Sequence, residues 1–225
     1  MTIDLLQAKL YSNISNHRSN AEGQLRSLRT VERFVILLDL FSSTNHRFFR
    51  GAEDAYVRAE VFFGLARDVF GYTASITVAK ELGDGILAIA VDGSEALEAC
   101  LVIKRMERFI RNEYADELFP FRIHTGIGFG KLKQLNRPAE DFLGEAIDEL
   151  AKILGQSDKG DCIIVSRPCY EMLKENIDKF PFLNVGPMEW WRDKGERTIV
   201  HDPIDYYCVE VSFEDDAQWN SFVYF

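Results

Sequence analysis

The feature that most constrains the fold is an uninterrupted apolar run that ends on a carboxylate. Phe34-Val35-Ile36-Leu37-Leu38 contains no polar residue and is followed directly by Asp39. A short run of this kind predicts a strand that is buried on both faces of a sheet. An unpaired carboxylate is costly at the end of such a strand, so Asp39 either emerges into solvent, caps the next helix or serves a site.

Further elements follow this strand in a regular order. A helical pattern covers Ala52–Phe70, and strand-like runs cover 72–80 and 85–91. Asp92 with Glu95 forms a capping box that opens a helix over 93–113. A strand over Phe121–Phe129 alternates, with Gly126 and Gly128 on the face where another backbone or a ligand approaches closely. The order β-α-β-β-α-β predicts an α+β fold with a ferredoxin-like core, a sheet with helices on one face and C-terminal additions.

The segments outside this core are assigned from composition and periodicity. We expect an N-terminal helix or arm over residues 1–30 and a single domain over residues 31–225. After the fourth strand we expect a polar loop over Lys131–Glu140 and then a helix from about Asp141 to Leu154, ended by Gly155. A strand over Cys162–Val165 and a helix opened by Ser166-Arg167-Pro168 follow. The C-terminal third, with Trp190, Trp191 and Tyr206–Val211, is expected to form a hairpin.

Composition excludes several classes of protein. The formal net charge of −10 argues against a nucleic-acid partner, because wrapping a phosphate backbone requires a basic surface. Apolar runs stay below the roughly 18 residues of a membrane-spanning helix, so we expect no membrane association. No secretory signal pattern opens the chain, and the four cysteines form no CxxC, which is typical of reduced thiols in a cytoplasmic protein.

A second carboxylate lies in the turn between the two middle strands. Asp84 sits in Gly83-Asp84-Gly85, and by itself this is most simply a hairpin turn. In a β-α-β-β core, however, the first strand lies beside the following hairpin, so Asp39 and Asp84 can meet at one edge. Two carboxylates there suit Mg²⁺ or Mn²⁺, and Ser42, Ser43 and Thr44 at a helix start offer backbone N–H groups to phosphate oxygens.

Three other charged positions are candidates. On the expected helix from Asp141, the residues Asp141, Asp148 and Lys152 fall at i, i+7 and i+11, hence on one face. The alternative is a solvated face with an Asp–Lys pair, worth a few tenths of a kcal/mol. Lys80, four residues before Asp84, is by itself most simply an exposed lysine at the end of a strand.

The order of these motifs resembles the catalytic domain of class III adenylyl/guanylyl cyclases. The resemblance spans about residues 31–175 and rests on five segments in sequence. They are Val35–Thr44, similar to the first metal motif; Lys80–Gly85, similar to the Lys-x-x-Gly-Asp hairpin; Arg122–Gly128, similar to the glycine-bearing strand; Asp141–Gly144, similar to the Asp-x-x-Gly helix start; and Gly160–Ser166, similar to the closing strand.

This resemblance implies a metal-dependent enzyme that acts as a homodimer. Asp39 and Asp84 would hold two divalent metal ions, Mn²⁺ or Mg²⁺, with the Leu40 backbone carbonyl as a further ligand. The backbone of Phe41, Ser42, Ser43 and Thr44 would cradle the phosphates of a nucleoside triphosphate, and Lys80 and Asp141 match the base-reading pair. The active sites would form between two protomers, because the metal aspartates and the base-reading residues come from different chains.

The chain also departs from the family pattern. Asp148 and Lys152 stand where the family usually has an Asn that orients the ribose and an Arg that stabilises phosphate charge. Lys152 supplies a point charge without bidentate geometry. A compact, divergent cyclase of this kind resembles the pyrimidine cyclases of bacterial Pycsar anti-phage systems, which make cyclic UMP or cyclic CMP for a separate effector protein.

Three alternatives remain open at this stage. The first is an ordinary adenylate cyclase, since Lys80 with Asp141 suits adenine. The second is a non-catalytic cyclase-homology module, favoured by Asp148 and Lys152 and opposed by the two metal aspartates. The third, a diguanylate cyclase or a polymerase palm, is disfavoured because the hairpin lacks a Gly-Gly-[Asp/Glu]-Glu-Phe motif and 225 residues scarcely hold palm partner domains.

Overall fold

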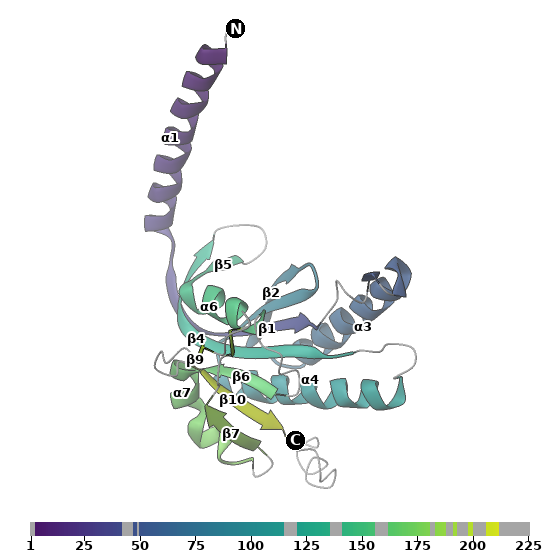
Figure 1. Ribbon diagram of the computed structural model, residues 1–225. Coiled ribbons are helices and arrows are strands. Elements are labelled where there is room, and N and C mark those ends of the chain that lie inside the picture. Colours follow the sequence, from purple (N-terminus) through teal and green to yellow (C-terminus); the bar gives the residue numbers. More distant parts are fainter. Residues whose placement is uncertain are drawn as a thin grey trace.

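One large mixed sheet forms the centre of the computed structural model (Figure 1). The structure describes residues 3–41, 47–48, 50–114, 121–135, 141–155, 162–180, 183–187, 191–192, 198–199 and 206–211. Seven strands follow the order β2-β3-β1-β4-β6-β10-β7, and an eighth, β5, pairs with β4 outside this path. The strands are β1 Thr30–Leu40, β2 Ile76–Leu82, β3 Gly85–Ala90, β4 Ile123–Leu135, β5 Asp141–Leu143, β6 Cys162–Ser166, β7 Leu183–Pro187 and β10 Tyr206–Val211.

The helices are α1 Ile3–Ser27, α3 Ala52–Gly71, α4 Gly93–Glu113, α6 Glu145–Leu154 and α7 Arg167–Ile177. The predicted β-α-β-β-α-β order is confirmed by β1, α3, β2, β3, α4 and β4. β1 lies in the middle of this core, antiparallel to both β3 and β4. The α+β, ferredoxin-like fold expected from the sequence is therefore the observed one.

Helices cover both faces of the sheet, which corrects the expectation of one covered face. On one face, α3, α4 and α7 pack against Ile36 and Leu38 of β1. On the opposite face, α6 contributes Leu150, Ile153 and Leu154 to a second cluster that includes Val35 and Leu37. Because alternate residues of β1 point to opposite faces and both faces are covered, the whole run reads as apolar.

Gly126 permits the close approach of α6. A Cβ atom built at Gly126 would lie 2.7 Å from Cδ1 of Leu150, which is closer than real Cβ contacts allow. The sequence predicted a close approach at this glycine and at Gly128, and the approaching element is α6. At Gly128 the nearest atom to a built Cβ is the carbonyl oxygen of Ala146, at 3.6 Å.

Two predicted boundaries between 131 and 154 were wrong. Residues Lys131–Leu135 were expected in a loop but continue β4, and residues 136–140 lie outside the described part of the chain. Asp141 was expected to open a helix but lies in β5, which pairs with the end of β4, and α6 begins only at Glu145. Backbone pairing on both sides overrides the polar composition here, since Gln134 also donates its N–H to the carbonyl of Arg29 at 3.0 Å.

The C-terminal third departs from a simple hairpin. Tyr206–Val211 does not pair with the tryptophan segment but enters the main sheet between β6 and β7. Trp191 belongs to a separate two-stranded ladder, formed by β8 Trp191–Arg192 and β9 Thr198–Ile199. Trp190 lies outside the described residues.

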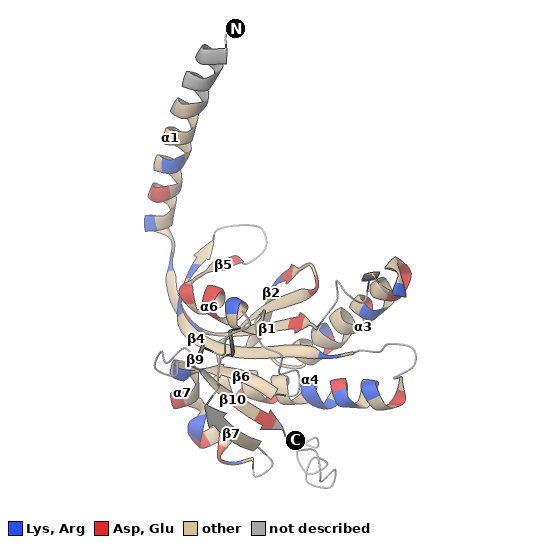
Figure 2. Cartoon of the chain, viewed as in Figure 1, with Lys and Arg blue, Asp and Glu red and all other residues tan. Residues whose placement is uncertain are grey.

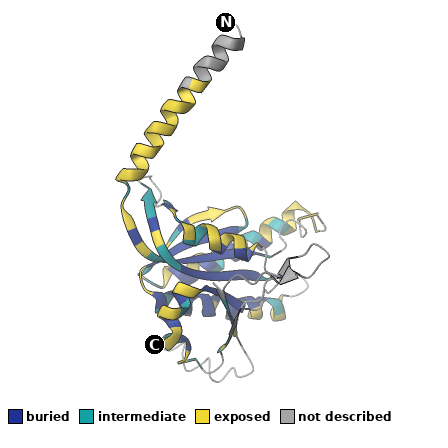
Figure 3. Ribbon diagram, turned by 60° about the vertical axis from the view of Figure 1, so that its left-hand side comes forward, coloured by how far each residue is buried: buried dark blue, intermediate teal, exposed yellow. Residues whose placement is uncertain are grey.

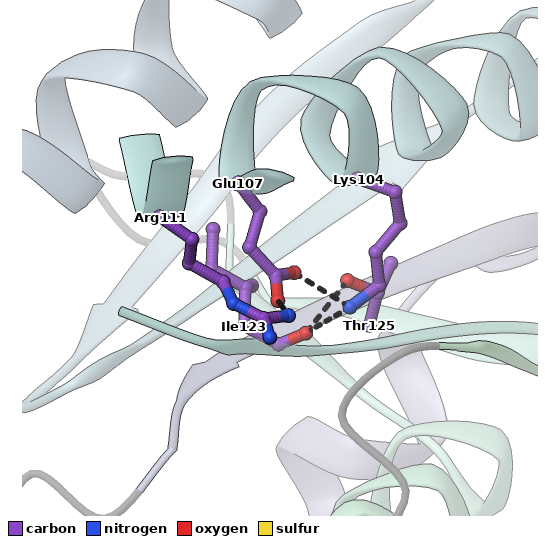
Figure 4. Close-up of polar contacts among 5 residues, drawn as sticks. All are labelled: Lys104, Glu107, Arg111, Ile123 and Thr125. Carbon is purple, nitrogen blue, oxygen red and sulfur yellow. Dashed lines mark hydrogen bonds and ion pairs between the residues drawn. The ribbon is translucent and has the colours of Figure 1, made fainter. Parts of the chain in front are cut away.

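A charged cluster is buried between α4 and β4 (Figure 4). Lys104 and Glu107 are only 3% and 2% exposed, and Nζ of Lys104 lies 2.8 Å from Oε2 of Glu107. Lys104 also donates to the backbone carbonyl of Ile123, and Arg111 approaches the other carboxylate oxygen of Glu107 at 3.8 Å. Burial raises the pKa of the Glu107 carboxyl, while the neighbouring Lys104 opposes that rise. Elsewhere on α4, charges of both signs are interspersed (Figure 2).

The N-terminal helix α1 stands away from the sheet and its helices (Figure 3). The side chains of Tyr11 and Ile14 are 64% and 61% exposed, so this helix buries little apolar surface within the chain. Among the helices that the structure describes, none combines the length and hydropathy needed to cross a lipid bilayer.

Candidate active site at the edge shared by strand β1 and the β2–β3 hairpin

Asp39 lies one residue before the end of β1, between two neighbouring strands. Its register partners are Gly85 of β3 and His124 of β4. A Cβ atom built on Gly85 would lie 3.5 Å from Oδ1 of Asp39, so the carboxylate extends across this glycine. The position is half-buried, at the end of a fully apolar stretch of the strand.

Asp84 is brought beside Asp39 by the tight turn of the hairpin. Leu82 pairs with Gly85, which leaves Gly83 and Asp84 as a two-residue loop. Gly83 has a φ of 68°, a left-handed conformation that favours glycine and is typical of the first central position in a type II′ turn. The backbone N–H of Leu40 donates to the carbonyl of Asp84 at 2.9 Å, which fixes the hairpin tip to the end of β1.

The two carboxylates repel each other. Burial raises the pKa of Asp39 from its ordinary value of 3.8 to about 6, and the negative charge of Asp84 adds to that rise. A partly buried carboxylate beside a second carboxylate is a site that a bound cation would stabilise.

Arg58 is a member of this site that the sequence reasoning missed. It comes from α3, is 1% exposed, and donates from Nη2 to the carbonyl oxygen of Phe41 at 2.6 Å. Burial lowers the pKa of Arg58 to about 10, and the carboxylate of Asp84 opposes that decrease. The sequence did contain a signal for Arg58, since this residue falls on the apolar stripe of α3. A charged residue on a stripe that faces the core requires a partner.

His124 was also not singled out from the sequence. It is buried, and its ring lies edge-on to the ring of Phe41, with the centroids 4.9 Å apart. Since register partners lie on the same face of a sheet, His124 and Asp39 share the face that carries α6. The predicted phosphate-cradling residue Phe41 therefore packs within the site. Ser42, Ser43 and Thr44 lie outside the described residues.

Lys80 and Asp141 are brought together although 61 positions separate them in the sequence. Nζ of Lys80 lies 3.9 Å from Oδ2 of Asp141, and the lysine side chain is about half exposed. A register shift between Val78 and Lys80 makes this contact possible. Because of this bulge, Lys80 pairs with Leu87, which faces α6, whereas Val78 pairs with Ala88, which faces the other helices.

Asp148 and Lys152 both lie on α6 and are exposed. Within the described residues, neither forms an ion pair with Asp39 or Asp84. The expected common face with Asp141 does not exist, because Asp141 lies in β5 rather than on the helix. The described residues also show no ion pair between Asp148 and Lys152, so the predicted surface pair is absent.

The donor set of this site fits a hard divalent cation. Asp39 and Asp84 supply carboxylate oxygens, which are the ligands that Mg²⁺ and Mn²⁺ prefer. Among the described residues, no group of three or more His, Cys, Asp or Glu side chains gathers around a metal position.

Most of the chain superimposes on solved cyclase domains. The adenylyl cyclase CyaB from P. aeruginosa matches with a TM-score of 0.62 and 17% identity, over 84% of this chain and 99% of that one. The guanylyl cyclase Cya2 matches with a TM-score of 0.60 and 18% identity, over 84% and 97% of the two chains. The guanylate cyclase domain of RhGC from Catenaria anguillulae, solved with GTP, matches with a TM-score of 0.57 and 15% identity, over 82% and 99%.

This chain has the class III nucleotidyl cyclase fold. Neither protein-family models nor curated protein sequences gave a match. At these identities the likeness establishes the fold, and the activity must be argued from the site.

Proposed function

We propose that this protein is a nucleotidyl cyclase that converts a nucleoside triphosphate into a 3′,5′-cyclic nucleotide and pyrophosphate. The observation that carries the proposal is the proximity of Asp39, near the end of β1, to Asp84, in the turn between β2 and β3 of a cyclase fold, where burial and the charge of Asp84 raise the pKa of Asp39. In this reaction the ribose 3′-oxygen forms a bond to the α-phosphorus, the bond from that phosphorus to the bridging oxygen breaks, and the hydroxyl loses its proton.

Asp39 and Asp84 would hold two divalent ions, Mn²⁺ or Mg²⁺, in this proposal. The ions, when bound, would polarise the triphosphate and neutralise the negative charge that develops on the pyrophosphate. The Leu40 carbonyl is a further candidate ligand: the Leu40 N–H already points to Asp84, and the N–H and C=O of one residue point to the same side of an extended strand. The chain itself positions the reacting atoms and excludes water from them.

Lys80 and Asp141 are the candidate base-reading residues. A lysine donor beside a carboxylate acceptor complements adenine, which offers a ring nitrogen acceptor beside an amino donor. The same pair complements uracil, whose O4 accepts and whose N3–H donates. The overall resemblance to pyrimidine cyclases favours UTP as the substrate, with CTP second, and ATP is the competing candidate because the Lys80–Asp141 pair also complements adenine.

A homodimer would complete this site. Asp148 and Lys152 are exposed on α6, and in this proposal a second copy of the chain would bring them to the triphosphate. The product, cyclic UMP in the favoured reading, would serve as a second messenger for a separate effector protein in anti-phage defence.

The substrate assay tests the activity and the base together. Purified protein is incubated with Mn²⁺ and with ATP, GTP, CTP and UTP separately, and products are identified by mass spectrometry. We expect cyclic UMP as the main product. Cyclic AMP as the main product would assign the enzyme to the adenylate cyclases instead. Nucleotide binding without turnover would favour the non-catalytic module.

Helix α1 is expected to contribute to dimerisation. Tyr11, Ile14, Ala21 and Leu25 follow spacings of three, seven and four residues, which place them along one stripe, as in a two-stranded coiled coil. Replacing Ile14 with Asp should weaken self-association by at least about tenfold, which is a loss of about 1.4 kcal/mol. Sedimentation velocity measures the change. Asn16→Asp, which adds the same charge on the opposite side of the helix, is the control and should leave the dimer intact.

A further inference from the structure

Arg58 is a fully charged side chain in an apolar part of the core. With 1% of its surface exposed, it is among the largest side chains that the protein buries completely, and its neighbours along α3 include the buried Phe62 and Phe63. Burying a guanidinium group costs several kcal/mol unless partners compensate for the lost water. The position of this residue therefore requires a reason beyond packing.

The contacts of Arg58 lead to the end of β1. Its Nη2 donates to the carbonyl of Phe41 at 2.6 Å, while its Nε has no hydrogen-bond partner within the described part of the chain. Two further hydrogen bonds hold the backbone of Phe41 and of its neighbour Leu40. Leu40 N–H donates to the carbonyl of Asp84 and Phe41 N–H donates to the carbonyl of Arg122, both at 2.9 Å.

This arrangement holds the backbone of Leu40 and Phe41 at three points. The hairpin tip fixes it from one side, Arg122, directly before β4, fixes it from the other, and Arg58 reaches it from the helix layer. The first two anchors belong to the sheet. The third ties the end of β1 to α3 and directs the carbonyl of Phe41 toward Arg58.

We propose that Arg58 is a positioning residue that fixes the backbone of Leu40 and Phe41 relative to the hairpin tip, and so sets the spacing of the oxygen atoms around Asp39 and Asp84. This inference rests on the proposed function, because it assigns those oxygen atoms to a metal site. Arg58 does not touch the metal or the substrate in this role. The planar, branched guanidinium holds a carbonyl in a defined direction better than the single ammonium group of lysine does.

Amide hydrogen exchange of the metal-free protein tests the positioning directly. In Arg58→Met, the amides of Leu40 and Phe41 should exchange at least about tenfold faster, which corresponds to a loss of about 1.4 kcal/mol of local protection. Arg58→Lys should give a smaller acceleration. Arg67→Met is the matched control: Arg67 lies on the same helix, is exposed and pairs with Glu81 at the surface, so its loss should leave both amides protected.

Mn²⁺ affinity, measured by isothermal titration calorimetry, is the second readout. We expect the dissociation constant to rise by about 10- to 100-fold in Arg58→Met, less in Arg58→Lys and not at all in Arg67→Met. A purely structural role would lower the melting temperature of the metal-free protein without changing Mn²⁺ affinity in the folded Arg58→Lys variant.

Two results would overturn the proposal, and both are independent of turnover. The first is unchanged protection of Leu40 and Phe41 in both Arg58 variants. The second is a loss of protection that extends equally to distant core amides such as Ile163 and Val165, which would indicate general destabilisation. If the wild-type protein bound no Mn²⁺, the proposed metal site would fail, while the exchange data would still decide whether Arg58 fixes this backbone.

Discussion

Replacing Asp39 with Asn is expected to abolish turnover and, at the same time, to stabilise the metal-free protein at neutral pH. The rate should fall by on the order of 10³-fold or more, because in the proposed site the change removes a metal ligand worth several kcal/mol of charge stabilisation. The gain in stability has a different origin. Asparagine is nearly the same size as aspartate but carries no charge to be buried or to repel Asp84.

The pH dependence of that gain follows from the pKa of Asp39. Its value is about 6 in the folded protein against an ordinary 3.8, so the folded state binds the proton more tightly than the unfolded chain. The wild-type protein therefore loses stability as the pH rises through this window. The variant should match it below about pH 4 and exceed it above pH 6, by on the order of 1–2 kcal/mol once solvent screening is considered.

Chemical denaturation at pH 4 and pH 7.5, together with the cyclase assay, measures both effects. Asp68→Asn provides the control, since Asp68 is an exposed residue of α3 and its replacement should change neither activity nor stability. An active Asp39→Asn protein would remove Asp39 from the catalytic site. An inactive variant that is less stable than wild type at pH 7.5 would contradict the electrostatic account of the Asp39–Asp84 pair.

The largest loss of stability is expected from breaking the buried pair between α4 and β4. Replacing Lys104 with Met leaves Glu107 buried without its nearest cation and removes the hydrogen bond to the carbonyl of Ile123. Removing one partner of a buried ion pair typically costs about 3–5 kcal/mol. For a chain of this size, that corresponds to a melting temperature lower by roughly 10 °C.

Three comparisons test this account. The double variant Lys104→Met with Glu107→Leu should recover much of the loss, because it leaves no uncompensated charge. The defect of the single variant should shrink at lower pH, since burial raises the pKa of Glu107 and protonation neutralises it. Arg18→Met, which breaks the exposed pair with Glu22 on α1, should cost less than about 1 kcal/mol. A single Lys104→Met variant as stable as wild type would refute the prediction.

Local periodicity was sufficient to predict the order of the core elements and the place of Asp39. An apolar run buried on both faces, a helix with its capping residue and a Gly-Asp-Gly turn each express their structure within a few residues. Asp92 accordingly accepts the hydrogen bond from the N–H of Glu95 that opens α4. The proximity of Asp39 and Asp84 followed from the core topology, in which the hairpin packs beside the first strand.

Composition was misleading where pairing between distant segments outweighed it. The polar residues after Gly130 were predicted as a loop, yet they continue β4 because β5 supplies backbone partners. Asp141 was predicted on a helix, because the Asp-x-x-Gly pattern does not reveal the short strand that pairs with β4. Its distance from the helix residue Asp148 is therefore set by a strand and a turn, not by helical spacing.

Side-chain patterns within single segments were enough to predict the α+β architecture and the buried strand that ends near Asp39, and the order of those segments predicted that Asp84 lies beside it. The positions of the other charged side chains depend on how segments distant in the sequence pack together. The bulge beside Ala79 turns Lys80 toward Asp141, and the packing of α3 places Arg58 beneath the end of β1. Register and burial are properties of two segments in contact, and no pattern within one segment specifies them.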